Sequence, residues 1–423
     1  MIIVISLLSL GQGDNAGSGG RETVLDERAP ADAFKVRTQD EINSLPEGAN
    51  AVLTENIDKL VITRPVSLFG DGKRVNSVTL AAPGARVCDV VAKSVVITAD
   101  DCIVDHCIVY ANSRYAIFAD RVSDVRVLDN TVRGNEVKND CGIYITNATR
   151  PVVEGNNVRG AYYCIYLDGC TDPVISYNYI GHVDGFRQGN DIYVTYTKGG
   201  VFRGNQVDYD PYHGPGSTED HNAIGFDHVE GMLIEDNKAG GHYYTLKIYN
   251  SKDCVIQNNT LYTGGVVLRT GFYDSGLVVR DNRISGNPDV GRSIGIKVHD
   301  GTVDCLFEDN EIWDCEYGIE EFHYPAGNKY LEGGPSLPCN NITLATNYIH
   351  DCSRSPIVIL DKGSCILKGN YYEPTPAPAV TKAPGATPTP VIKPMLQPSP
   401  AVQPSGGNTI IDFFSWLYHR IFG

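Results

Sequence analysis

The sequence lacks the short motifs that hold most structural metals and haem groups. No Cys-x-x-Cys, Cys-x-x-Cys-His or His-Glu-x-x-His occurs among the 423 residues, so zinc ribbons, c-type haem proteins and zincin-type proteases have no support. Twelve cysteines are too few for a disulfide scaffold of this length. Positive charge is also scarce, because 35 Lys and Arg stand against 51 Asp and Glu, a net charge of −16. An acidic surface repels phosphate backbones, so we expect no nucleic-acid partner.

Methionine and tryptophan are rare, whereas glycine and tyrosine are abundant. The chain has 3 Met and 2 Trp against 44 Gly and 24 Tyr, a balance that favours strands and turns over a helical bundle. Hydrophobic residues make up 42% of the chain, which is enough to bury a core and excludes wholesale disorder.

The N-terminus has the character of an export signal. Residues Met1–Leu10 are apolar and are followed by small and polar residues up to Gly20. The apolar run is too short to span a bilayer and resembles the central part of a signal peptide, although no Lys or Arg precedes it. We predict that residues 1–20 direct export and that the protein is extracellular or at the cell surface. The alternatives are a truncated start or a disordered N-terminus.

Three Asn-x-Thr sequons fit an exported glycoprotein. They begin at Asn147, Asn258 and Asn341, and we predict these asparagines as glycosylation sites. Such short motifs also recur by chance.

The C-terminal part changes composition abruptly. Residues 373–407 contain ten prolines among Thr, Ala, Val and Lys, which predicts an extended, semi-rigid stalk. Residues 408–423 then form a short apolar stretch with a narrow polar stripe when drawn as a helix. Since such a helix is too short to span a bilayer, we predict that it anchors the chain at a membrane surface or docks on a protein partner. The alternative is that it packs back on the main domain.

Between these ends a six-residue phrase, apolar-x-x-Asn-x-apolar, recurs ten times, mostly at spacings of 22 to 28 residues. Its asparagines are Asn130, Asn156, Asn178, Asn205, Asn237, Asn259, Asn282, Asn310, Asn347 and Asn370. An earlier copy has His106 where the asparagine is expected. A second short segment with period-2 alternation follows each copy, as in Gly142–Ile145.

Two short strands per repeat of about 20–30 residues indicate a solenoid in which each coil covers the edge of the next. Asparagines at one turn position would then stack and hydrogen-bond along the axis. The sequence therefore predicts an all-β protein, a single right-handed parallel β-helix over residues 34–372. Thr38, with Glu41 three residues later, predicts a capped helical turn that covers the open end of the first coils.

These repeats carry a resemblance to a known family. Together with the opening phrase Arg64–Gly70, Arg-Pro-Val-Ser-Leu-Phe-Gly, they are similar to the right-handed parallel β-helix repeat proteins of the NosD-like, carbohydrate-binding and sugar-hydrolase type, in the pectate-lyase-like superfamily. The resemblance implies the fold and favours a carbohydrate partner. It leaves the activity open, because the same fold carries lyases, hydrolases, epimerases, adhesins and structural proteins.

Aligning the second strands of the repeats predicts two outward-facing columns. The first column is Phe118, Tyr144, Tyr166, Tyr193, Gly225, Lys247, Val267, Lys297, Glu320 and Ile359. The second is Asp120, Thr146, Asp168, Thr195, Asp227, Tyr249, Arg269, His299, Phe322 and Asp361.

Three stacked tyrosines, Tyr144, Tyr166 and Tyr193, would form an aromatic platform for sugar rings. The alternative is an ordinary aromatic ladder on the outside of the solenoid. The predicted substrate-binding residues are these three with Tyr212, His213 and His228.

Charged residues gather farther along the same face. The candidate catalytic residues are Asp227, Lys247, Arg269, Lys297, His299 and Glu320. A cation that neutralises a sugar carboxylate acidifies the neighbouring C–H, and Lys, Arg or His can then remove that proton. Asp227 and Glu320 lie about four coils, or roughly 19 Å, apart, too far for two-carboxylate glycoside hydrolysis. The alternatives are a pair that Glu320 forms with Glu321 or with a loop Asp, or a solvated charged face.

Long insertions adjoin these coils. Residues 208–222 and 285–293 leave from one edge of the strand column, and residues 323–341 leave from the other. Loops that bracket one face often make a groove. The acidic residues Asp208, Asp210, Glu219 and Asp220 are candidates for a calcium site, with a merely solvated loop as the alternative.

Two cysteines, Cys315 and Cys352, fall five residues after successive repeat asparagines. They would stack, either as buried thiols or as a disulfide.

Two functions remain open from the sequence. The first is an exported surface protein that binds, and modifies by β-elimination or epimerisation, an acidic polysaccharide or cell-surface glycan. The second is a non-catalytic structural or adhesion protein that uses the β-helix as a rigid spacer.

Overall fold

The computed structural model describes residues 28–373 apart from 112, 135–140, 184–188, 209–221, 263, 288–291, 324–336 and 361–362. The predicted export segment, proline-rich stalk and C-terminal helix therefore lie outside the described residues and stay predictions.

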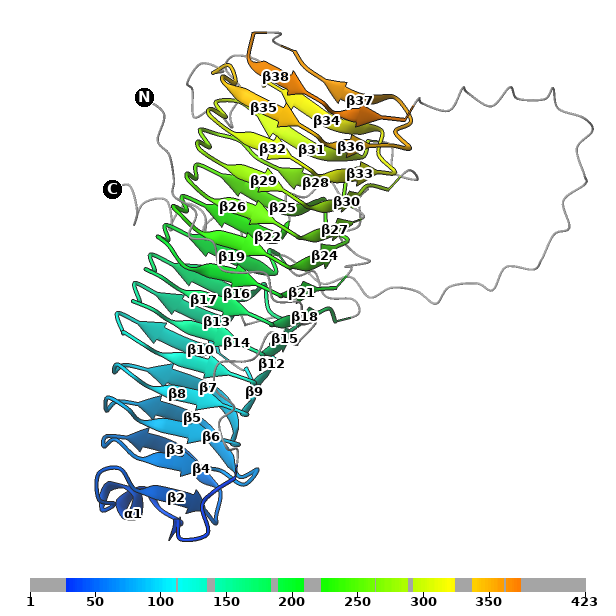
Figure 1. The fold of residues 1–423 in the computed structure, drawn as a ribbon. Helices are drawn as coiled ribbons and strands as arrows, with labels where there is room; N and C mark the ends of the chain where they lie inside the picture. Colours follow the sequence, from blue (N-terminus) through cyan, green and yellow to red (C-terminus); the bar gives the residue numbers. More distant parts are fainter. Residues whose placement is uncertain are drawn as a thin grey trace, which may run out of the picture. The chain divides into compact units, whose positions relative to one another are not determined.

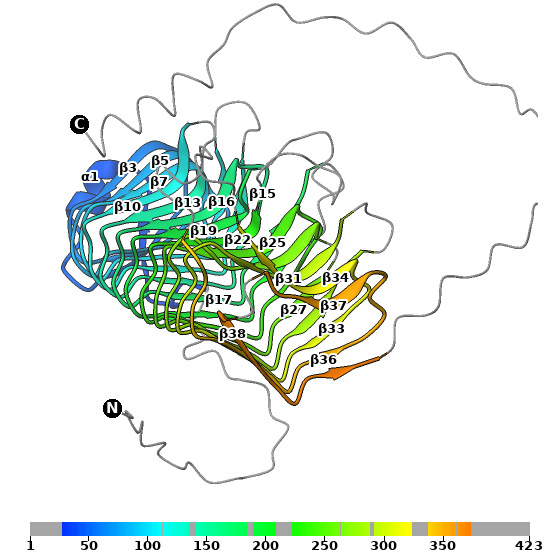
Figure 2. The same cartoon turned by 90° about the horizontal axis from the view of Figure 1, so that it is seen from above.

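The described chain winds into a right-handed parallel β-helix, with strands stacked along one axis (Figure 1). Every strand pairing between coils is parallel, and each coil carries up to three strands, which define three faces (Figure 2). The predicted all-β fold is confirmed.

Face 1 is the 15-stranded sheet. Its strands are β1 (Phe34–Val36), β2 (Asn50–Leu53), β4 (Ser67–Phe69), β6 (Arg86–Cys88), β8 (Ile103–Asp105), β11 (Arg126–Leu128), β14 (Val152–Glu154), β17 (Val174–Ser176), β20 (Val201–Arg203), β23 (Leu233–Glu235), β26 (Val255–Gln257), β29 (Val278–Arg280), β32 (Leu306–Glu308), β35 (Ile342–Ala345) and β38 (Cys365–Lys368).

Face 2 follows face 1 in each coil. Its strands are β9 (Ile108–Tyr110), β12 (Thr131–Arg133), β15 (Asn157–Arg159), β18 (Tyr179–Gly181), β21 (Gln206–Val207), β24 (Lys238–Gly240), β27 (Thr260–Tyr262), β30 (Arg283–Ser285), β33 (Glu311–Trp313), β36 (Tyr348–Ile349) and β39 (Tyr371–Tyr372).

Face 3 completes the coil. Its strands are β3 (Ile57–Ile62), β5 (Arg74–Leu80), β7 (Val91–Ile97), β10 (Tyr115–Asp120), β13 (Cys141–Thr146), β16 (Tyr163–Asp168), β19 (Ile192–Thr195), β22 (Asn222–Asp227), β25 (Tyr244–Tyr249), β28 (Val266–Arg269), β31 (Ile294–His299), β34 (Tyr317–Phe322) and β37 (Ser355–Val358). Faces 2 and 3 are joined at β7, which pairs with both β9 and β10.

The predicted asparagine ladder runs along the turn between faces 1 and 2. Asn237 shows its pattern, since its side-chain amide donates to the Phe202 carbonyl (3.1 Å) and to Asn259 Oδ1 (2.8 Å). The same bonds join all ten asparagines from Asn130 to Asn370. The residue before each ladder asparagine has a positive φ, as at Asp236 (58°) and Gly204 (63°), which explains the frequent Asp, Asn and Gly there.

In the coil before Asn130, the residue opposite the ladder asparagine lies one position later in the chain than the sequence predicts. Strand β8 pairs with β11 so that Val104 lies opposite Val127, which places Cys107, not His106, opposite Asn130. The backbone N–H of Cys107 accordingly donates to Asn130 Oδ1 (2.9 Å). His106 takes the left-handed turn position instead, with a φ of 52°. The prediction that His106 replaces a ladder asparagine is therefore wrong.

One hydrophobic core runs from Val36 to Cys352 inside the coils. At its N-terminal end, α1 (Gln39–Asn43) is capped by Thr38 and Glu41 as predicted. Ile42 of this helix is buried in the core, and the Gln39 side chain hydrogen-bonds the Val61 backbone N–H (2.8 Å) and carbonyl (2.7 Å).

Cys315 and Cys352 lie buried as thiols, with no disulfide between them. Within the described ranges, no helix is long and apolar enough to cross a membrane.

Candidate functional site

The outward positions of face 3 form one continuous row whose register the strand pairing defines. From the N-terminal coils onward the row reads Phe118, Tyr144, Tyr166, Tyr193, Gly225, Lys247, Arg269, Lys297, Glu320 and Val358. An aromatic run is thus followed by three cations and a carboxylate on consecutive coils.

The predicted register is wrong at β28. Arg269 pairs with Lys247 on one side and Lys297 on the other, whereas the sequence alignment had placed it in the second column beside Tyr249 and His299. Val267, expected to face outward, is fully buried in the core. The row also ends at Val358 rather than Ile359. Because of this shift, the three cations stand directly above one another at the spacing of the coils, about 4.8 Å.

Aromatic rings pack around each cation. The Lys247 ammonium lies 4.8 Å from the centroid of Tyr249, the Arg269 guanidinium lies 4.9 Å from Tyr244, and the Lys297 ammonium lies 3.7 Å from Phe322. All three cationic residues are buried, with at most 8% exposed. Cation–π contacts of this kind partly replace the lost hydration.

Burial and neighbouring charge act most clearly on Lys297. Burial, followed by repulsion from Arg269, lowers the pKa of its ammonium to about 8. Near neutral pH a fraction of Lys297 is therefore deprotonated, and a neutral amine can accept a proton.

His299 is less suited to that role. It is fully buried, its Nδ1 lies 2.6 Å from an Asp300 carboxylate oxygen, and burial lowers its pKa to about 3. A histidine with so low a pKa stays neutral and is a weak base.

Two described carboxylates near the row, Glu320 and Asp274, offset little of its positive charge. Arg292 forms a 2.6 Å ion pair with Oε1 of Glu320. The other carboxylate oxygen, Oε2, is buried without a hydrogen bond. Burial raises the pKa of Asp274, behind Arg269, to about 8, so this group is largely neutral at pH 7. Arg269 Nε is likewise buried without a hydrogen-bond partner. The row therefore favours an anion.

Neither carboxylate pair considered from the sequence suits glycoside hydrolysis. Asp227 lies on β22 and Glu320 on β34, four coils apart as expected. Glu321 is the inward neighbour of Glu320 and accepts hydrogen bonds from the Leu360 backbone N–H (2.9 Å) and Ser364 Oγ (3.0 Å). Since successive strand residues face opposite sides, Glu320 and Glu321 do not form a pair.

The three predicted tyrosines do lie together. Tyr144 and Tyr166 stack with ring centroids 5.0 Å apart, and Tyr166 lies 5.7 Å from Tyr193. Tyr193 leans over Gly225 and its hydroxyl reaches the hydroxyl of Tyr249. A Cβ at Gly225 would come within 2.6 Å of the Tyr193 ring, so this glycine lets the aromatic run join the cations.

The other predicted binding residues fall elsewhere. His228 lies on the turn between faces 3 and 1, where it contacts Asp227 (2.6 Å) and stacks on Tyr196 (4.7 Å between centroids). Tyr212 and His213 lie outside the described residues. Sequence reasoning missed Arg292, Tyr244 and the aromatic role of Phe322; the insertion 285–293 could have pointed to Arg292, but pairing with Glu320 needs the folded chain.

The sequon asparagines Asn147, Asn258 and Asn341 are exposed at turns with positive φ. Of the predicted calcium ligands, only Asp208 is described. Its carboxylate accepts hydrogen bonds from the Tyr179 hydroxyl and from Gln206 Nε2 (3.0 Å).

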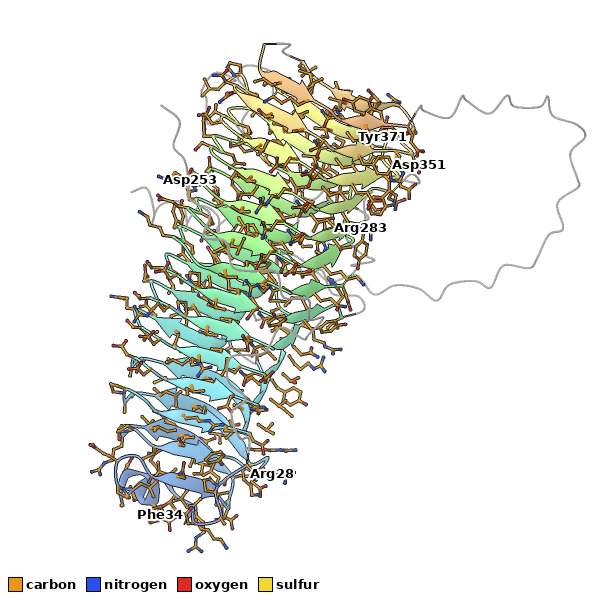
Figure 3. All side chains as sticks on the ribbon, viewed as in Figure 1. Arg28, Phe34, Asp253, Arg283, Asp351 and Tyr371 are labelled. Atoms are coloured by element: carbon orange, nitrogen blue, oxygen red, sulfur yellow. The ribbon has the colours of Figure 1, made fainter. Side chains whose placement is uncertain are left out.

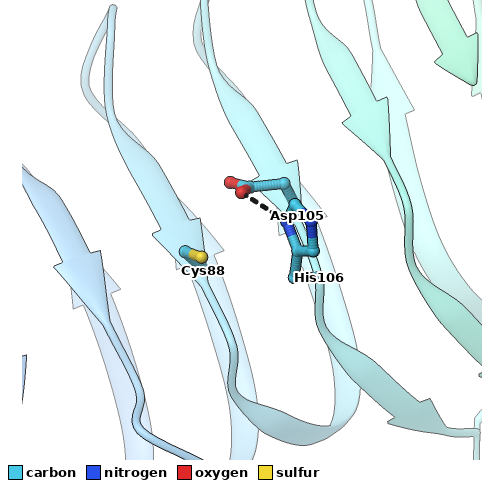
Figure 4. Close-up of side chains that lie close together, drawn as sticks. All are labelled: Cys88, Asp105 and His106. Carbon is cyan, nitrogen blue, oxygen red and sulfur yellow. Dashed lines mark hydrogen bonds and ion pairs between the residues drawn. The ribbon is translucent and has the colours of Figure 1, made fainter. Parts of the chain in front are cut away.

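Three groups of metal-ligating side chains converge within the described ranges. In the first, Cys88, Asp105 and His106 (Figure 4), Asp105 is held by Arg86 at 2.6 Å and by His106 at 2.9 Å. The second group is Glu321, His323 and Cys339. Here Glu321 accepts the hydrogen bonds from Leu360 and Ser364 described above. Both groups are accounted for by ion pairs and hydrogen bonds of the fold. The third, His182, Asp191 and His242, is discussed below.

Comparison with solved structures finds sugar-active proteins at low identity. The A-module of mannuronan C-5 epimerase AlgE6 from Azotobacter vinelandii matches at 14% identity and a TM-score of 0.42, over 79% of this chain and 93% of that chain. A hyperthermoactive exopolygalacturonase from Thermotoga maritima matches at 10% identity and a TM-score of 0.49, over 79% and 86%. The periplasmic alginate epimerase AlgG matches at 12% identity and a TM-score of 0.43, over 80% and 83%. No curated protein sequence matches the chain.

The family comparison covers more than half of the chain. A family model described as the right handed beta helix region matches residues 91–219 and 222–375, which are the coils that carry the row and the ladder. The chain therefore belongs to the right-handed β-helix family.

Proposed function

We propose that the protein binds an acidic polysaccharide along face 3 and modifies it by removing the proton next to a uronate carboxylate. The observation that carries this proposal is the stack of Lys247, Arg269 and Lys297 on three successive coils. Three buried cations stacked on successive coils are stabilised by an anionic ligand, and a polyuronate offers one carboxylate per sugar.

Different residues of the row bind the carboxylate and remove the proton. Arg269, with its unpaired buried Nε, and Lys247 hold the carboxylate and stabilise the charge that develops when the neighbouring C–H ionises. Lys297, with a pKa near 8, removes the C5 proton in its neutral form. Asp227 holds His228 and Asn250, His299 packs against Phe272 and Phe322, and Glu320 orients Arg292 through their ion pair.

The proton balance allows two outcomes. In β-elimination, C5 loses its proton, the C4–O4 bond breaks, a C4=C5 double bond forms and the leaving oxygen takes a proton. In epimerisation, the proton leaves from one face of C5 and another is returned to the opposite face. Both begin with the same abstraction, but unsaturated uronides report elimination, whereas solvent deuterium incorporated at C5 reports epimerisation.

The aromatic run supplies the neighbouring sugar sites. Tyr144, Tyr166 and Tyr193 present stacked rings along the same row, and aromatic faces bind the C–H faces of sugars. His228, Tyr212 and His213 remain candidates for contacts at the edges. Export, glycosylation at the three sequons and attachment through residues 408–423 complete this proposal and rest on the sequence alone.

The proposal is tested on polymannuronate and polygalacturonate, each beside its carboxyl-reduced form. We expect the full chain to release unsaturated uronides or to exchange the C5 proton with deuterium. We expect no such reaction with the carboxyl-reduced polymers. Arg269→Gln should lower kcat/KM by about 100-fold or more, the usual effect of removing one preorganised donor.

Arg283→Gln is the matched control, because Arg283 lies on face 2 and projects from the side of the β-helix (Figure 3). Its variant should keep full activity. If no acidic glycan is turned over or bound, or if Arg269→Gln acts as the wild type does, the proposal fails and the non-catalytic spacer function gains support.

A further inference from the structure

The corner between faces 2 and 3 holds a buried group of two histidines and one aspartate. His182 directly follows β18, Asp191 directly precedes β19, and His242 lies between β24 and β25. The histidines come from two coils that flank the coil of β21 and β22. Asp191 and His242 are fully buried, and His182 is nearly so.

Their ligand atoms converge on one point. His242 Nε2 lies 3.2 Å from Asp191 Oδ2, and His182 Nε2 lies 3.6 Å from the same oxygen. His182 Nε2 is also 2.9 Å from the Asp208 carbonyl oxygen. Ligands held about 2.1 Å from one ion are separated by about 3.0 Å at right angles and about 3.4 Å at the tetrahedral angle, and the three observed distances lie within about 0.2 Å of this range.

The second ring nitrogen of His242 supports a cation at this point. Its Nδ1 lies 3.4 Å from the Gly240 carbonyl oxygen, which can only accept a hydrogen bond. A proton on Nδ1 leaves Nε2 of the neutral ring as a lone pair that faces the Asp191 carboxylate, and two acceptors at 3.2 Å repel. In this tautomer a metal ion or an extra proton between them removes the repulsion. A backbone carbonyl on the outer nitrogen is the usual support of a metal-bound histidine.

We propose that His182, Asp191 and His242 bind one divalent ion of the zinc class, with the Asp208 carbonyl as the fourth ligand. Two imidazole nitrogens and one carboxylate suit Zn²⁺, whereas Ca²⁺ and Mg²⁺ prefer sites built from oxygen alone. This site goes beyond the proposed sugar chemistry. The ion would link the two coils that flank the coil of β21 and β22. It would therefore stabilise the corner between faces 2 and 3, next to the part of the row from Tyr193 to Lys247.

The experiment measures metal binding by the full chain rather than its activity. Protein stripped with EDTA is dialysed against Zn²⁺, and bound metal is counted by mass spectrometry. We expect one equivalent of zinc and a rise in Tm over the EDTA-treated protein. Co²⁺ should bind in its place and give the visible absorption of a low-coordinate nitrogen–oxygen site.

Two substitutions and two controls locate the ion. His242→Gln and Asp191→Asn should weaken Zn²⁺ binding by about 100-fold or more, because losing even an outer support costs about 10–100-fold. His350→Gln removes a histidine that also contacts two carboxylates, Glu311 and Asp351, and His323→Gln tests the Glu321 group. Both should bind zinc as the wild type does.

The result on the wild type is decisive even if a variant does not fold. Absence of stoichiometric zinc after reconstitution would overturn the proposal. Zinc that persists in folded His242→Gln, or that is lost only in His323→Gln, would overturn it as well. Folding of each variant is checked by circular dichroism in EDTA, where the proposal expects variant and stripped wild type to share the same spectrum.

Discussion

Among single residues, Lys297 has a buried environment that changes its acid–base chemistry. Its ammonium is buried beside Arg269 and over the ring of Phe322, and its pKa falls from 10.5 to about 8. The neutral, proton-accepting form becomes more populated as the pH rises through that value.

We therefore expect the rate of the proposed reaction to rise with pH and to level off above about pH 8. Lys297→Arg keeps the positive charge but cannot lose its proton, so it should retain polyuronate binding while turnover drops by about 100-fold or more. Initial rates across this pH range, with binding measured by calorimetry, check both points. A variant that turns over as fast as the wild type would remove Lys297 from the role of base.

Structural elements are held in register by the asparagine ladder. Asn259 donates its side-chain amide to the Ile234 carbonyl (3.1 Å) and to Asn282 Oδ1 (2.9 Å), and its own Oδ1 accepts from the backbone N–H of Asn237 (3.0 Å). Its replacement would leave several buried groups without partners at once.

Asn259→Ala should consequently lower the free energy of unfolding by about 3 kcal/mol or more, since each unsatisfied buried group costs about 1–3 kcal/mol. Asn370 ends the ladder and is only partly buried, so water can replace its bonds and Asn370→Ala should cost clearly less. Urea unfolding followed by circular dichroism compares the two. Equal losses would mean that burial of the ladder contributes little.

On the scale of the whole molecule, stability comes from contacts between neighbouring coils. The continuous core of the described residues begins at Val36 and ends at Cys352, so we expect these coils to fold without the C-terminal segments.

A protein ending at Glu373, without the stalk and the C-terminal segment, should unfold at the same Tm as the full chain within about 2 °C. Differential scanning calorimetry of the two proteins tests this expectation. A markedly lower Tm for the shortened protein would indicate that residues 408–423 pack on the β-helix, which was the alternative reading of the sequence.

The fold follows from the amino-acid pattern alone, because the repeated asparagine and its two apolar neighbours leave one parallel stacking that buries all of them. The pattern also placed Tyr144, Tyr166 and Tyr193 in one row, since clear alternation defines those strands. It misplaced Arg269, because the run Val266–Leu268 is apolar throughout and alternation cannot tell which residue faces outward. Only the hydrogen-bonded register of β28 between β25 and β31 decided that, and with it the continuous stack of cations. The group of His182, Asp191 and His242 was equally invisible, because its members are 60 residues apart at the ends and meet only where three coils are wound on top of one another.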